Sequence, residues 1–423
     1  MSRAGSTERR VAGRALRRIA VAAVCSAALL ACSTPQSPQH ERPPPNVLFV
    51  LVDTLRADFL GTYGHDLDTS PEIDRLAAEG YVFENAQSVS PWTNPAIATL
   101  FSGRYPDALI PPLPHRQAIG RPLPDDVETL AEKLQSRGYR TVGLVDHPGI
   151  SPGLDFDQGF ETFLHLFKEG GFDSWQVTDT GFVFDQVAAQ LERPRDERPL
   201  FLYLHLVYPH HPYKPEAGYA EPFWPEGRVT RPYRRLANYR GEIRQTDALV
   251  GRIMAAVQDR GLDASTWLVL ASDHGEGFWE HGMWEHGNSL FEELLRIPLI
   301  LRPPGGRDEP VRIATRVSLV DVYPTLLDLA GAEAPTGLDG ESLVPLLHGE
   351  TLERKTPIFA GSPHSGDVER AAVYQGRFKY IKEAEHDLLY DLEADPGEAE
   401  PITDRAATLA NLRSTVLEHQ GRD

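Results

Sequence analysis

The stretch Asn46-Val-Leu-Phe-Val-Leu-Val-Asp53 is a continuous apolar run that ends in an acidic residue. Such a run, without polar alternation, is typical of a strand that is buried on both faces of a parallel sheet. Two more runs of this kind, 200–207 and 265–272, follow farther along the chain. Segments with helical periodicity separate the three runs, among them 125–137 and 239–258. This alternation predicts an α/β fold with a mostly parallel central sheet sandwiched by helices.

The pattern changes near residue 347, where short strand-like segments replace the long buried runs. A segment with helical character, 404–419, then closes the chain. We therefore expect a main domain over residues 46–346 and a small C-terminal α+β subdomain on an antiparallel sheet over residues 347–423.

The N-terminal segment differs from the rest in composition. An Arg-rich stretch, 1–18, precedes an apolar run, 19–30, that is too short to span a membrane. This order is typical of a secretory signal, and Leu-Leu-Ala before Cys32 resembles a bacterial lipobox. The resemblance implies cleavage after residue 31 and lipidation of Cys32, with ordinary cleavage nearby as the alternative. The Pro-rich segment 33–45 is then a tether, and the protein an extracytoplasmic membrane lipoprotein.

The formal net charge of −19 argues against nucleic acid as a partner and against electrostatic docking on anionic lipid. An anionic substrate would need local positive charge from a metal ion or from a few basic side chains. With Cys25 removed and Cys32 lipidated, no thiol is left for a disulfide, a metal ligand or a nucleophile.

Acidic and histidine residues follow the three predicted buried strands. Asp53 follows the first strand, His210 comes shortly after the second, and Asp273-His274 follow the third. Ligands in open α/β sheets bind at the carboxyl ends of the strands, so these side chains are expected to meet there. Burying a charge costs several kcal/mol unless the charge is paired or bound to a metal. A functional site is therefore a better explanation for these residues than a purely structural role.

The stretch 93–102 predicts a helix, with Gly103 just past its end. Thr93 is a favoured N-cap type, so a simple capping role is one interpretation. The other is that its hydroxyl faces the strand-end acids. Asp53, Asp273, His274 and the Thr93 oxygen would suit one divalent cation, Mn²⁺, Mg²⁺, Ca²⁺ or Zn²⁺. A second metal is not expected, because His205 and His364 have no well-spaced acid.

The chain resembles the sulfatase branch of the alkaline phosphatase superfamily over nearly all of residues 45–402. The stretches that carry the resemblance, in order, are 46–58 (NVLFVLVDTLRAD), 63–64, 69–83, 93–106 (TNPAIATLFSGRYP), 209–213, 239–251, 272–277 (SDHGEG), 286–299, 320–340 and 389–398. The resemblance implies an alkaline phosphatase-like fold and a metal-dependent ester hydrolase or transferase.

The departures from the family pattern concern the chemistry. Family sulfatases place Cys or Ser, converted to formylglycine, ten residues before a Gly; counted back from Gly103, that residue is Thr93. Threonine cannot become formylglycine. Where family sulfatases carry an Asp-Asn pair, this chain has Asp273-His274. The position nearest to the catalytic Lys of the family's late loop is His286. The metal set of two acids, a Thr and a His is similar instead to that of phosphoryl-transferring relatives, including phosphoglycerol transferases and Thr-dependent phosphodiesterases.

By that resemblance, Thr93 attacks the phosphorus of a phosphate ester or diester. His210 binds or protonates the leaving group, and His286 holds a substrate oxygen. Arg56 and His147 are further candidates for binding the anionic ester. Two alternatives stay open: a sulfuric ester hydrolase, and a catalytically degenerate binding lipoprotein. The sequence does not predict the oligomeric state.

Overall fold

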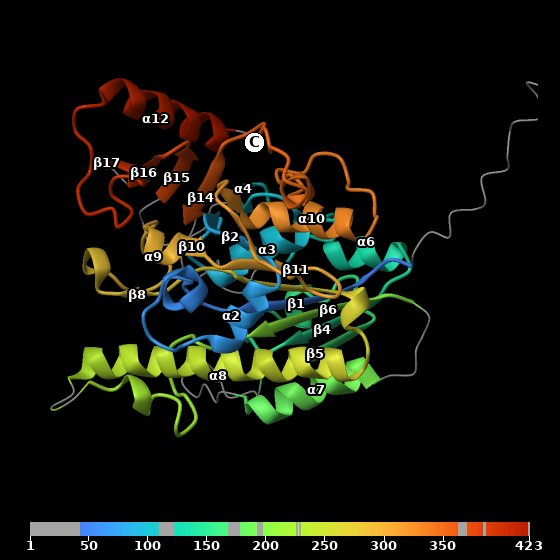
Figure 1. Ribbon diagram of the computed structural model, residues 1–423. Coiled ribbons are helices and arrows are strands. Elements are labelled where there is room, and N and C mark those ends of the chain that lie inside the picture. The colour runs from blue at the N-terminus through green and yellow to red at the C-terminus, as the bar shows by residue number, and fades with distance from the viewer. Residues whose placement is uncertain are drawn as a thin grey trace, which may run out of the picture. The chain divides into compact units, whose positions relative to one another are not determined.

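Strand β1 (Asn46–Val52) lies in the middle of the main sheet of the computed structural model (Figure 1). The eight strands follow the order β12-β2-β11-β7-β1-β6-β4-β5. The other seven are β2 (Tyr81–Phe83), β4 (Arg140–Val145), β5 (Thr162–His165), β6 (Leu200–Leu206), β7 (Thr266–Ser272), β11 (Leu299–Arg302) and β12 (Val311–Ile313). The strands from β7 to β5 run parallel, whereas β11 is antiparallel to β7. The predicted mostly parallel sheet is confirmed.

The structure describes residues 43–109, 122–167, 178–192, 198–225, 227, 230–362, 370–383 and 386–421. The predicted signal peptide, Cys32 and almost all of the predicted tether lie outside these residues. The chain from Pro44 to Asp423 forms one unit, so the boundary predicted near residue 347 stays a prediction. Among the described residues, no helix has both the length and the apolar character needed to cross a membrane.

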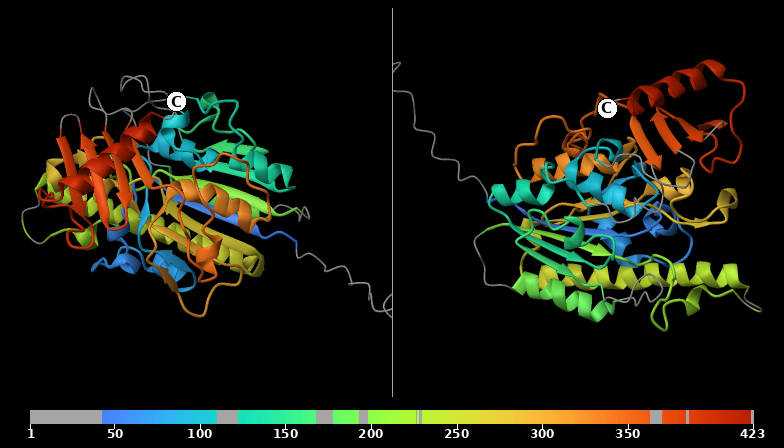
Figure 2. Two further views of the ribbon diagram at one scale, coloured as in Figure 1. Left: turned by 90° about the horizontal axis from the view of Figure 1, so that it is seen from above. Right: turned by 180° about the vertical axis from the view of Figure 1, so that it is seen from behind.

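Helices cover both faces of the main sheet (Figures 1 and 2). Val47, Phe49 and Leu51 of β1 point into one core, and the residues between them point into the other. The first core is covered by α3 (Thr93–Ser102), α6 (Leu130–Ser136) and α10 (Val322–Leu329), and the second by α2 (Pro71–Ala78), α7 (Thr180–Glu192) and α8 (Arg231–Asp259). Burial on both faces explains why β1 lacks polar alternation.

The shorter elements connect these layers. Their bounds are β3 (Ala86–Gln87), α4 (Pro106–Leu109), β8 (Gly277–Phe278), β9 (Trp284–Glu285), α9 (Glu292–Leu295), β10 (Arg296–Ile297), β13 (Val317–Ser318) and α11 (Val344–Leu347). Strands β10, β3 and β13 form a three-stranded sheet, and β8 pairs with β9 in a hairpin.

Two helices differ in length from their predictions. Helix α6 was expected over 125–137 but starts at Leu130, because Thr129 and Glu132 form a reciprocal capping box that fixes its N-terminus. Helix α8 was expected from Tyr239 but starts at Arg231, with a proline in its first turn, where a missing N–H costs nothing.

The C-terminal part carries an antiparallel sheet of four strands, as predicted. These strands are β14 (Ile358–Ser362), β15 (Arg370–Gln375), β16 (Phe378–Glu383) and β17 (His386–Asp391), and helix α12 (Ala406–Gln420) follows them. One set of sheet residues joins the first core of the main domain, and another packs around Phe291, close to α9.

A buried ion cluster links the C-terminal sheet to α9. Lys379 of β16 is fully buried, and its Nζ lies 2.9 Å from Glu292 Oε1 and 2.8 Å from Glu398 Oε1. The Tyr374 hydroxyl donates to Glu292 as well. Burial raises the pKa of Glu398 to about 7, against the lowering effect of Lys379. A lysine in this position therefore compensates two buried carboxylates.

We expect Lys379→Met to lower the free energy of unfolding by about 3–5 kcal/mol at pH 8, because it leaves both carboxylates without their buried cation. The loss should be smaller at pH 5, where Glu398 can take up a proton. The matched control is Lys133→Met, since Lys133 pairs with the exposed Glu128 at 3.5 Å and should contribute under about 1 kcal/mol. Urea unfolding measures both variants, and equal losses would contradict the prediction.

Candidate active site

Two buried acids lie side by side at the carboxyl edge of the main sheet. Val52 of β1 is paired with Ser272 of β7, so the next residue on each strand is an aspartate. Asp53 and Asp273 are both fully buried. Asp273 Oδ1 accepts hydrogen bonds from the backbone N–H groups of Thr54 and His274. Both carboxylate oxygens of Asp53 and Oδ2 of Asp273 have no hydrogen-bond partner among the described residues.

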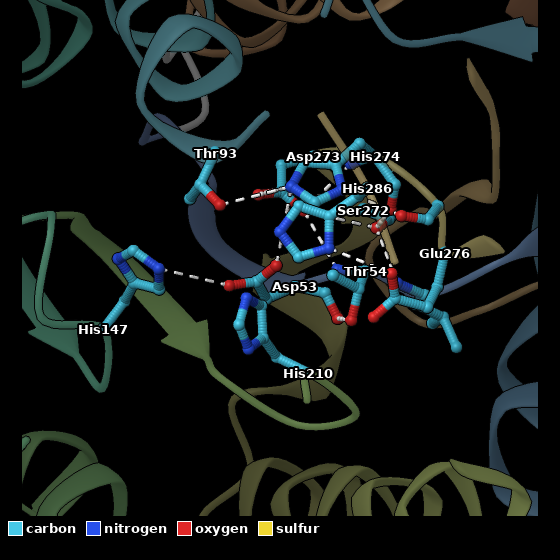
Figure 3. Close-up of polar contacts among 12 residues, drawn as sticks. Asp53, Thr54, Thr93, His147, His210, Ser272, Asp273, His274, Glu276 and His286 are labelled. Atoms are coloured by element: carbon cyan, nitrogen blue, oxygen red, sulfur yellow. Dashed lines mark hydrogen bonds and ion pairs between the residues drawn. The ribbon is translucent and has the colours of Figure 1, made fainter. Parts of the chain in front are cut away.

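His274 completes this group (Figure 3). Its Nδ1 lies 2.9 Å from the carbonyl oxygen of Gly275, so Nδ1 carries the proton and Nε2 is left as a lone-pair donor. Ligand atoms of Asp53, Asp273 and His274 lie within 4.8 Å of one another. Unpartnered carboxylate oxygens with an imidazole nitrogen are a donor set for a divalent cation. The residues therefore fit the predicted metal, and they leave its identity open.

The electrostatics of the acids agree with this fit. Burial, followed by the charges of Asp273 and Glu276, raises the pKa of Asp53 well above its usual value. Burial lowers the pKa of His274, which keeps the imidazole neutral as a ligand must be. A bound cation would compensate the carboxylates and act as a Lewis acid toward an anionic ester.

Thr93 is the first residue of α3 and does not cap it. Trp92 occupies the N-cap position in an extended conformation, and no side chain caps the helix. The capping role considered for Thr93 is therefore wrong. Its Oγ1 lies 3.2 Å from His274 Nε2, so the hydroxyl points toward the strand-end acids (Figure 3).

Three further histidines surround the acids. His147, which follows β4, has its Nε2 3.5 Å from Asp53 Oδ2. His210, which follows β6, lies with its ring 4.8 Å from that of His286. The ring of His286 lies 4.6 Å from that of His274. Thus all three predicted histidines lie in one cluster with the metal-site residues (Figure 3).

Arg56, which was predicted to bind the substrate, forms hydrogen bonds within the protein instead. Its guanidinium is buried and makes a bidentate contact with Asp58, and Nη1 donates to Glu280 and to the backbone oxygen of Glu276. Four of its hydrogen bonds are thus committed inside the protein, so we do not assign Arg56 to substrate binding.

Some residues at the site were not predicted for it. His205 is fully buried, stacks on His147 at 5.3 Å, and has its pKa lowered to about 4 by burial. Glu276 is also fully buried and contacts both Tyr213 and His286. Glu276 and Tyr213 fall inside family stretches of the sequence, 272–277 and 209–213, which is the signal that could have indicated them.

One metal was predicted rather than two. Among the described residues, the group of at least three acids and histidines that could hold an ion is Asp53, Asp273 and His274. His364, considered for a second metal, lies outside the described residues.

Comparison with known proteins decides the family. The model of the Sulfatase family matches residues 45–332. The chain belongs to the sulfatase family. A second model, of the C-terminal part of N-sulphoglucosamine sulphohydrolase, matches residues 279–420. The resemblance to the sulfatase family is confirmed, whereas the likeness to phosphoglycerol transferases and Thr-dependent phosphodiesterases stays a prediction.

The relatives of this sulfatase-family chain extend over most of its length. Arylsulfatase K of Xenopus laevis is 27% identical and covers 84% of this chain and 78% of its own. The Delta 4,5-hexuronate-2-O-sulfatase of Bacteroides thetaiotaomicron is 25% identical, with 84% and 83% covered. The phosphonate monoester hydrolase of Agrobacterium radiobacter shares the fold, with a TM-score of 0.72, 23% identity, and 88% and 95% covered. The relatives favour the alternative prediction, sulfuric ester hydrolysis, over the phosphate ester.

We expect purified wild-type protein to hold about one divalent cation per chain, and Asp53→Asn and Asp273→Asn to hold less than about a tenth of that, because each removes an anionic ligand. Elemental analysis after desalting measures the ratio. Asp125→Asn, in an exposed turn, is the control and should bind as the wild type does. Two metal ions per wild-type chain, or unchanged metal in both site variants, would contradict the assignment.

Proposed function

We propose that this chain is a metal-dependent ester hydrolase and that its substrate is a sulfate ester. The observation that carries the proposal is the buried Asp53–Asp273–His274 group with the Thr93 hydroxyl 3.2 Å from His274 Nε2. The named relatives, an arylsulfatase and a hexuronate sulfatase, support the sulfate ester.

In the proposed reaction, Thr93 first loses its hydroxyl proton to solvent, its Oγ1 attacks the sulfur, and the bond between sulfur and the alcohol oxygen breaks. His210, which takes up a proton when the anionic ester binds, gives that proton to the departing alcohol, and His286 and His147 bind the oxygens of the anionic group. Water then attacks the sulfur and returns one proton to His210, the bond to Thr93 Oγ1 breaks and restores the alkoxide, and the product leaves as hydrogen sulfate. A cation on the two aspartates and His274 would favour the alkoxide of Thr93 and offset charge on the ester.

A second candidate is hydrolysis or transfer of a phosphorus ester, and the residue that favours it is Thr93. Threonine cannot become formylglycine, so a sulfate ester of Thr93 lacks the hemiacetal route by which formylglycine sheds sulfate. A phosphoryl group on Thr93 can instead pass directly to water or to another hydroxyl, with the same histidines in the same roles.

We expect Thr93→Val to lower kcat by about 10³-fold or more on whichever ester is turned over, because it keeps the shape of the side chain and removes the attacking oxygen. Thr93→Ser should retain part of the activity. Thr99→Val is the matched control, since Thr99 lies on the same helix and its buried hydroxyl has no hydrogen-bond partner among the described residues.

The assay compares kcat/KM on aryl sulfate, aryl phosphate, diaryl phosphate and aryl phosphonate esters with metal-loaded protein. A preference for sulfate supports the first candidate, and a preference for phosphorus supports the second. Full activity of Thr93→Val would remove Thr93 from the mechanism. Metal binding without turnover of any ester would identify a binding protein instead.

We further propose that the protein works outside the cytoplasm as a lipoprotein. The support is the Arg-rich start, the short apolar run and the Leu-Leu-Ala sequence before Cys32. A lipid anchor and a Pro-rich tether would hold the enzyme near a membrane without a transmembrane helix.

We expect Cys32→Ser to abolish incorporation of labelled palmitate and to release the protein from the membrane fraction. Cys25→Ser is the matched control, because Cys25 would be removed with the signal, and it should leave labelling unchanged. Mass spectrometry of the mature N-terminus checks the cleavage site. An unmodified N-terminus in the wild type would contradict lipidation.

A further inference from the structure

Glu276 is fully buried, and each of its two carboxylate oxygens has a hydrogen-bond partner. Its Oε2 accepts a hydrogen bond of 2.7 Å from the Tyr213 hydroxyl, and its Oε1 lies 2.9 Å from His286 Nδ1. Its backbone is held as well, since its N–H donates to Glu293 and its carbonyl oxygen accepts from Arg56. The side chain therefore has a fixed place next to His286.

The contact with Glu276 decides which nitrogen of His286 is available. A carboxylate oxygen can only accept, so His286 Nδ1 carries a proton, and Nε2 is the nitrogen that Glu276 does not contact. The ring is surrounded by those of His274, His210 and Trp92, at 4.6, 4.8 and 6.0 Å between centroids. Figure 3 shows the ring of His286 among Asp53, His210 and His274, with Glu276 to its right.

The backbone after His286 restricts the ring further. Gly287 has a φ of 81°, and a Cβ at this position would lie 2.3 Å from the Trp92 ring. The close approach of Trp92 thus requires glycine here. His286 is held from both sides, by Glu276 at Nδ1 and by the packed turn at 287.

We propose that Glu276 is the positioning residue of His286 in the ester hydrolysis proposed above, on which this inference rests. Glu276 fixes the tautomer with the proton on Nδ1 and directs Nε2 at the ester, and Tyr213 holds Glu276 in place. Carboxylates that orient metal-ligating imidazoles contribute about 10–100-fold to activity, and we expect an effect of the same order for Glu276 on His286.

The matched variants separate positioning from mere packing. Glu276→Ala should lower kcat by about 10–100-fold with little change in KM, because Nε2 is no longer directed. Glu276→Gln should lose less, since its amide oxygen can still accept from Nδ1–H. Glu285→Gln is the control: Glu285 is adjacent to His286 in sequence, but its carboxylate bonds to Trp284 Nε1 at 2.7 Å. It should keep wild-type kcat.

A double-mutant cycle with His286→Ala tests whether Glu276 acts through His286. If it does, Glu276→Ala causes no further loss of kcat in the His286→Ala background. Losses that multiply would overturn the proposal, because they would mean that Glu276 acts by another route.

Nitrogen-15 NMR of histidine-labelled, full-length protein gives a readout that does not depend on activity. The signal of His286 is assigned from the spectrum of His286→Gln. We expect a protonated Nδ1 in the wild type, and loss of that preference in Glu276→Ala but not in Glu285→Gln. An unchanged tautomer in Glu276→Ala would overturn the inference. A wild type that turns over no ester but shows this tautomer would overturn the proposed function alone.

Discussion

Two carboxylates held side by side in the protein interior are the constraint on which the candidate site depends. Asp53 and Asp273 follow adjacent parallel strands in register, so the sheet itself brings them together. Backbone donors satisfy one oxygen of Asp273 and leave three of the four carboxylate oxygens without hydrogen-bond partners among the described residues. Such a pair is costly in a low dielectric unless a cation compensates it, which ties the stability of this sheet edge to metal binding.

Histidines, and not Arg56, are the predicted substrate-binding residues that lie around the acids, because Arg56 is committed to internal ion pairs. Burial lowers the pKa of His147 and of His210, whereas the charge of Glu276 raises the pKa of His286 against the effect of burial. The loop that carries His286 is anchored at its far end by the C-terminal sheet, through the buried cluster around Lys379. The described residues of the C-terminal part therefore support the site, whose central residues come from the main sheet and its loops.

Much of the fold could be predicted because its signals are local. Apolar runs without alternation indicated β1, β6 and β7, and short strand-like segments indicated the C-terminal sheet. The start of α8 was misplaced because its first turns are polar and carry no core-facing period. The start of α6 was misplaced because a capping box, rather than the hydrophobic pattern, ends the preceding loop.

By itself, the sequence determined the strands, the acids at their ends and the family, because these depend on periodicity and on the spacing of residues along one chain. Only the tertiary structure decided that the Thr93 hydroxyl faces His274, that Arg56 pairs with acids inside the protein, and that Glu276 contacts the Nδ1 of His286. These contacts join loops that are far apart in sequence and have no repeating pattern, so only the packed fold sets the direction of each side chain.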